Sequence, residues 1–153
     1  MVNIVIEVSK YLLILLIAAY TYWNFSYFRF RDPWQQGRVC VRQNAAMFLL
    51  HFVAYAVLFL KSEDERVILF YLAQVVFLAV YLGLYKVFYP LRSRLLVNNM
   101  CMLLCIGFVI LTRLDFDKAI RQFVIVAISA LITWIIPFIL ERVWQLANIP
   151  WVY

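Results

Sequence analysis

The sequence predicts an all-α protein that crosses a membrane several times. Of its 153 residues, 67% are hydrophobic and 14% are charged, whereas an ordinary soluble domain is about half apolar and about a quarter charged. Only three glycines and four prolines are present, too few for a collagen-like or linker-rich chain. The segments of alternating apolar and polar residues typical of transmembrane strands are missing. A bundle of transmembrane helices is the class that remains.

Five apolar runs are long enough to cross a hydrocarbon core of about 30 Å, which takes about 20 helical residues. They cover residues 3–23, 44–60, 67–88, 95–112 and 123–140. The first run closes in aromatic side chains that are typical of the membrane interface, namely Tyr20, Tyr22, Trp23, Phe25 and Tyr27. The connecting segments are too short for a soluble domain, so any function lies in the bundle or on its surfaces.

The positive charges predict an orientation, because an excess of Lys and Arg in short loops marks the cytoplasmic side. One side of the predicted membrane carries eight such residues: Arg29, Arg31, Arg38, Arg42, Lys86, Arg92, Arg94 and Arg142. The other side carries five, interleaved with five acids: Lys61, Arg66, Arg113, Lys118 and Arg121 with Glu63, Asp64, Glu65, Asp115 and Asp117. We therefore expect an external N-terminus. The net charge of +6 is a topology signal in this interpretation, and we expect no nucleic-acid partner.

The last residues predict the beginning of a sixth helix. The segment 150–153, Pro-Trp-Val-Tyr, places a proline where a helix starts and aromatic rings where the interface lies. The alternative is a short tail that lies on the membrane surface.

Few polar side chains fall inside the runs. Glu7 and Lys10 are three residues apart, so we expect them to pair at a helix end. The lone His51 is interpreted as a hydrogen-bonding group to a neighbouring helix rather than a ligand or proton relay. The same role is expected of three amides, Gln74, Asn98 and Asn99.

No catalytic, cofactor-binding or metal-ligating set is predicted. Cys101 and Cys105 share a helix face, but a structural zinc site needs four ligands and nothing completes this pair. We expect both cysteines to be small packing residues.

The densest polar segment is the predicted external loop 112–122. Its candidate site residues are Arg113, Asp115, Asp117, Lys118, Arg121 and Gln122. They fit a salt-bridged turn between antiparallel helices, or a contact with a phosphate-bearing lipid headgroup.

At this loop the chain resembles a known family. The segment 98–126 is similar to the opening of the SEDS family, the RodA, FtsW and SpoVE membrane proteins of bacterial elongation, division and sporulation. In that family the first core helix carries a glycine, a short external loop follows, and a basic residue with glutamine opens the second helix. Gly107 and the pair Arg121-Gln122 stand in those places.

The resemblance implies both an organisation and a function. Residues 1–94 would form a three-span membrane extension, and residues 95–153 the first two core helices and the start of the next. The family polymerises glycan strands from lipid II in the bacterial plasma membrane, together with a class B penicillin-binding transpeptidase. Its essential aspartate lies in a later external loop, so no catalytic residue is transferred, and we expect this N-terminal part alone to be inactive. No cofactor is implied, and the lipid bilayer is the direct partner.

Two other functions stay open at this stage. One is a non-enzymatic membrane scaffold that binds another membrane protein through its aromatic-rich first spans. The other is part of a small transporter or lipid flippase, which the scarcity of charge, glycine and proline within the runs argues against.

Overall fold

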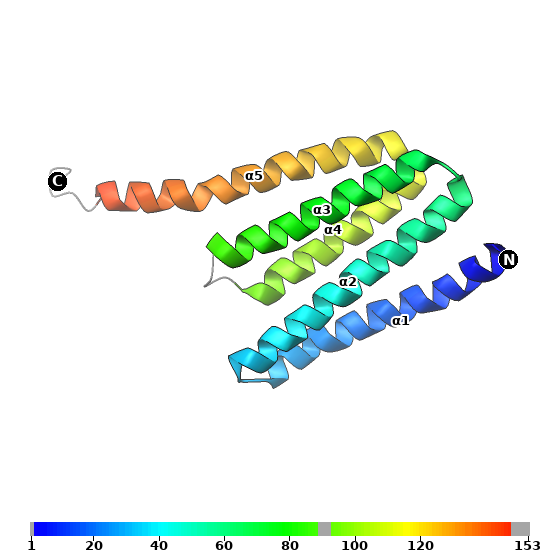
Figure 1. Cartoon of the computed structure of the whole chain (residues 1–153). Coiled ribbons are helices and arrows are strands. Elements are labelled where there is room, and N and C mark those ends of the chain that lie inside the picture. Colours follow the sequence, from blue (N-terminus) through cyan, green and yellow to red (C-terminus); the bar gives the residue numbers. More distant parts are fainter. Residues whose placement is uncertain (1, 89–92, 148–153) are drawn as a thin grey trace.

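The computed structural model describes residues 2–88 and 93–147, and every element in these ranges is a helix. The helices are α1 (Val2–Arg29), α2 (Pro33–Ser62), α3 (Glu65–Phe88), α4 (Arg94–Leu114) and α5 (Phe116–Ala147). Successive helices run antiparallel, and α5 projects beyond the ends of α3 and α4 (Figure 1). The all-α prediction is confirmed. The predicted start of a sixth helix, 150–153, lies outside the described residues.

Four of the helices, α1 to α4, are long and apolar enough to cross a membrane. A chain with several such helices is a membrane protein in its broad class. The crossing of α5 and the external N-terminus stay predictions.

The boundaries of α2 correct the sequence-based prediction. The second span was expected to begin at Asn44, but the helix begins at Pro33, eleven residues earlier. Only residues 30–32 separate α1 from α2, so Arg38 and Arg42 lie on a helix and not in a loop. Hydropathy marks the part of a helix that lies in hydrocarbon, whereas a polar continuation beyond the membrane surface keeps its backbone hydrogen bonds and stays helical.

Local capping explains why the chain turns where it does. The Asp32 side chain accepts a hydrogen bond from the Trp34 backbone N–H at 3.1 Å, and Pro33 fills the first helical position. Glu63 ends α2 with a left-handed backbone (φ 52°) and donates its N–H to the Phe59 carbonyl at 2.8 Å. The acidic run 63–65 therefore lies where the chain reverses its direction between α2 and α3.

The interior consists of two clusters of buried side chains. The larger one draws residues from α1 to α4, and Cys101 and Cys105 are fully buried within it. Their predicted role as small packing residues is confirmed. The smaller cluster joins α2 and α3 to α5 through Tyr55, Phe70 and Ala119. Because α4 packs into the same core as the first three helices, the division at residue 94 rests on the resemblance alone and stays a prediction.

Candidate functional site

Polar side chains inside the bundle join neighbouring helices. His51 and Gln74 are both fully buried, and His51 Nε2 lies 2.9 Å from Gln74 Oε1. Since an amide oxygen only accepts, the ring N–H is the donor. This bond between α2 and α3 confirms the interpretation of His51 and Gln74. Among the described residues, His51 Nδ1 and Gln74 Nε2 have no hydrogen-bond partner.

Gln43 is the centre of a second set of contacts. Its Nε2 donates to Asn24 Oδ1, and its Oε1 accepts from Asn98 Nδ2, each at 3.2 Å. Asn98 Nδ2 also donates to the Cys40 carbonyl at 3.2 Å. The fully buried Gln43 thus connects α1, α2 and α4. The predicted role of Asn98 is confirmed, while the role of Gln43 was not predicted.

Two tyrosine hydroxyls also join neighbouring helices. The Tyr20 hydroxyl donates to Asn99 Oδ1 at 2.9 Å, which joins α1 to α4 and confirms the prediction for Asn99. The Tyr55 hydroxyl lies 2.8 Å from Thr112 Oγ1, which joins α2 to α4. These bonds fix how the helices are rotated against one another, and no hydroxyl among them is paired with a base as a nucleophile would be.

The predicted loop 112–122 is a very short turn. Asp115 alone separates α4 from α5. Its Oδ1 accepts from the Lys118 backbone N–H at 3.1 Å, and its Oδ2 lies 3.1 Å from Lys118 Nζ. Asp115 therefore caps α5 and holds the turn, as in the salt-bridged interpretation.

The other candidate residues of this loop separate into two groups. Asp117, Lys118, Arg121 and Gln122 are exposed on the first two turns of α5. Arg113 lies on the last turn of α4 and lines a groove that faces α1. The structure therefore does not gather all six residues around one centre.

The cap makes the turn sensitive to acid. The backbone hydrogen bond from Lys118, followed by its side chain, holds the pKa of the Asp115 carboxyl below its ordinary value. The carboxylate therefore stabilises the fold above the unfolded-state pKa of about 3.9, and this contribution is lost as the pH falls through the lowered folded-state pKa.

We expect the thermal midpoint of the detergent-solubilised chain to fall as the pH is lowered below about 4. Asp115→Asn should weaken this dependence, because the amide does not titrate. Asp117→Asn, a neighbour outside the ion pair, is the matched control and should behave as wild type. Equal pH dependence in all three chains would contradict the role of Asp115.

A groove of about 490 Å³ opens between α1, α2 and α4. Its polar lining includes one cation from each of these helices: Lys10, Lys61 and Arg113. Its apolar lining consists of Ile6, Leu13, Ala54, Val57, Leu58, Val67 and Val109. We call it the basic groove. The expected pair of Lys10 with Glu7 is confirmed, with 2.6 Å between Lys10 Nζ and Glu7 Oε1.

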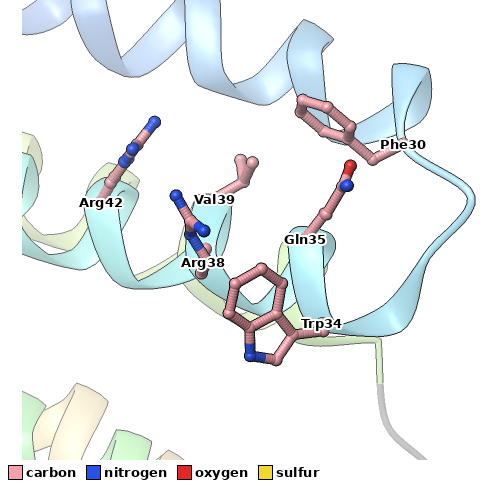
Figure 2. A pocket seen from close by; sticks show the side chains of 6 residues that line it. All are labelled: Phe30, Trp34, Gln35, Arg38, Val39 and Arg42. Atoms are coloured by element: carbon pink, nitrogen blue, oxygen red, sulfur yellow. The ribbon is translucent and has the colours of Figure 1, made fainter.

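A smaller hollow of about 240 Å³ lies at the opposite end of the bundle, where α1 turns into α2. Figure 2 shows its lining side chains, with the Arg38 guanidinium beside the Trp34 indole and Arg42 pointing toward α1. The Arg38 Cζ lies 4.6 Å from the centre of the Trp34 ring, which is a cation–π contact. Both arginines of this hollow belong to one helix.

The two ends of the bundle differ in charge. Counting only residues whose side chains the structure describes, the end with the α1–α2 turn carries one acid, Asp32, and six cations: Arg29, Arg31, Arg38, Arg42, Lys86 and Arg94. The end with the α2–α3 and α4–α5 turns carries six cations and six acids: Lys10, Lys61, Arg66, Arg113, Lys118 and Arg121 with Glu7, Glu63, Asp64, Glu65, Asp115 and Asp117. We call them the basic end and the mixed end.

Comparison of the chain with models of protein families, with curated proteins and with solved structures finds no match. What the residues themselves establish is a polytopic helical membrane protein with a buried polar framework and a groove lined by three cations. Among the described side chains, no group of three His, Cys, Asp or Glu residues is placed to hold a metal ion.

Proposed function

We propose that the chain is the N-terminal membrane part of a SEDS-type peptidoglycan glycosyltransferase. It would lie in the bacterial plasma membrane with its N-terminus outside and its basic end in the cytoplasm. The observation that carries the proposal is the segment 98–126, in which Gly107 and Arg121-Gln122 occupy the places of the family's motifs. In this proposal α1, α2 and α3 extend the core, and α4 and α5 are its first two helices.

The charges at the two ends support the proposed orientation. Cations concentrate on the cytoplasmic side of membrane proteins, and the basic end has five more described cations than acids, whereas the mixed end is balanced. With the basic end inside, α4 runs outward and the Asp115 turn is external. That is the direction expected for the family's first core helix.

The surroundings of Gly107 also fit the proposal. A Cβ atom added at Gly107 would meet no heavy atom within 4 Å, so no described neighbour requires a glycine there. Small residues in membrane helices commonly mark places where another helix approaches closely. A further core helix packed closely against this part of α4 would explain why residue 107 is a glycine.

The proposal assigns no chemical step to residues of this chain. The described helices would pack and orient the core, and polymerisation of lipid II would depend on the family's later external loop. A class B penicillin-binding transpeptidase is the expected partner of the whole enzyme.

The test is to follow the reading frame past codon 153 and to express everything that it encodes. We expect several further spans, a long external loop with an acidic residue, and a whole chain that converts labelled lipid II into a glycan ladder together with its transpeptidase. Residues 1–153 alone should give no ladder. A stop directly after codon 153, with the short chain stable in cells, would overturn the proposal in favour of a scaffold. Substrate-dependent flux without polymerisation in proteoliposomes would overturn it in favour of a transporter.

We expect Gly107→Ala to have different effects in the 153-residue chain and in the whole enzyme. In the 153-residue chain we expect the free energy of unfolding to stay the same or to rise by up to about 1 kcal/mol, because alanine favours a helix and its Cβ enters open space. In the whole enzyme the same change should lower polymerisation, because a closely packed helix would have to move. Gly83→Ala, also in open space on α3, is the control. Unchanged activity for Gly107→Ala would contradict a helix contact at this position.

A further inference from the structure

The basic groove has a shape that follows from how α1 and α4 contact each other. The two helices meet through Tyr20 and Asn99, which lie toward the basic end. Toward the mixed end they form opposite walls of the groove, with Leu13 on α1 and Val109 on α4, and Ala54 and Val57 of α2 are also in the lining. The groove is therefore an opening between α1 and α4.

Two of the three cations, Lys61 and Arg113, lie at one end of this opening, and Lys10 lies inside the first apolar run, from which a lysine side chain can extend toward the membrane interface. Lys61 is in the last turn of α2 and Arg113 in the last turn of α4, directly after the apolar runs 44–60 and 95–112. Residues that follow an apolar run lie at the level of the lipid headgroups. The apolar lining of the groove belongs to the runs themselves, at the level of the acyl chains. The groove thus has a cationic head and an apolar body.

Two of the three cations of the head, Lys61 and Arg113, have no acidic partner in the described part of the chain. Lys10 pairs with Glu7, but both side chains are 60% exposed, and an exposed pair of this kind is weak enough to exchange partners. Cations at the C-terminal ends of helices also offset the negative end of the helix dipole. The helix dipole accounts for Lys61 and for Arg113 separately, but it does not explain why they line the same groove as Lys10 of α1.

We propose that the basic groove binds an anionic glycerophospholipid of the surrounding bilayer. Its phosphate lies among Lys10, Lys61 and Arg113, and one acyl chain runs between the apolar side chains that line the groove, Leu13, Val57 and Val109 among them. Lysine and arginine are the side chains that bind phosphate oxygens most strongly. A volume of about 490 Å³ lies within the range of small-molecule sites. This proposal does not rest on the polymerase assignment.

The test is native mass spectrometry of the detergent-solubilised chain with phosphatidylglycerol or phosphatidylcholine added. We expect the wild type to retain one phosphatidylglycerol and much less phosphatidylcholine. The triple variant Lys10→Gln, Lys61→Gln, Arg113→Gln should retain about tenfold less phosphatidylglycerol, because anionic lipids bind through their charge. The matched control Arg31→Gln, Arg66→Gln, Lys86→Gln removes three exposed cations outside the groove and should change retention less than about twofold.

Two further measurements distinguish a lipid site from a site for a free anion. Val109→Trp keeps every cation but fills the apolar body, so it should also lower phosphatidylglycerol retention. Excess inorganic phosphate should not displace the lipid, because phosphate alone gains nothing from the apolar wall. Equal retention of the two lipids by the wild type, an unchanged triple variant, or complete displacement by inorganic phosphate would overturn the proposal.

Discussion

Replacing Phe108 by alanine should lower the free energy of unfolding by about 3 kcal/mol, the largest effect that we expect from a single substitution. Phe108 on α4 is 1% exposed, and its ring centre lies 5.6 Å from that of Phe123 on α5. Removing the ring leaves a cavity between two helices, and the dispersion contacts of its neighbours are lost. Equilibrium unfolding in mixed micelles measures the change.

The matched control for this substitution is Phe25→Ala on α1. Phe25 is 75% exposed, so its ring faces lipid or detergent in the folded state as well as in the unfolded state, and we expect a change within about 0.5 kcal/mol. Comparable losses for the two substitutions would show that Phe108 is not packed as described.

Replacing Gln43 by leucine should lower the free energy of unfolding by about 2 kcal/mol. Leucine removes the bonds to Asn24 and Asn98 together. The half-buried Asn24 Oδ1 loses this donor, and Asn98 Nδ2 keeps the Cys40 carbonyl as its acceptor. Hydrogen bonds between membrane helices contribute on average about 0.6 kcal/mol each, so the two lost bonds account for about half of the loss, and the desolvated polar group left without its partner accounts for the rest. The same unfolding experiment measures it.

Gln35→Leu is the control for Gln43→Leu. Gln35 lies on the same helix but is exposed, so the substitution should be close to neutral. If Gln43→Leu lowered the free energy of unfolding no more than Gln35→Leu, the hydrogen bonds of Gln43 would not stabilise the contact between α1, α2 and α4.

Much of the fold could be predicted because hydrophobic runs and helices coincide inside a membrane. The runs 67–88 and 95–112 agree with α3 and α4 to within about two residues at each end. The largest exception is the beginning of α2, where a polar helical segment carries Arg38 and Arg42. The helix α1 also ends six residues after the run 3–23, and α5 begins seven residues before and ends seven residues after the run 123–140. Composition separates apolar from polar residues, but it does not separate a polar helix from a loop.

The sequence indicated which polar side chains form hydrogen bonds between helices, but it did not indicate their partners. A polar side chain in an apolar helix needs a hydrogen bond, which correctly indicated His51, Gln74, Asn98 and Asn99. Their partners depend on how each helix is rotated and tilted, and packing sets these angles rather than the sequence of one helix. Among the described hydrogen bonds between different helices, only the one between His51 and Gln74 joins two residues that were both predicted to form such a bond.

The lining of the basic groove could not be predicted from the sequence either. Lys10, Lys61 and Arg113 are about fifty residues apart along the chain, and no spacing rule connects them. Arg113 was a candidate because its loop is dense in charge, but its partners in the groove come from α1 and α2. The neighbouring candidates of that loop either cap α5 or face away from the groove.

We propose that the helices cross the bilayer with the basic end in the cytoplasm, and single-cysteine labelling in intact cells tests this orientation. Ser62 and Ser93 are exposed and lie at opposite ends of the bundle, whereas the natural cysteines are at most 5% exposed. An impermeant thiol reagent should label Ser62→Cys in intact cells and Ser93→Cys only after the membrane is opened. Labelling of Ser93→Cys but not Ser62→Cys in intact cells would contradict this orientation.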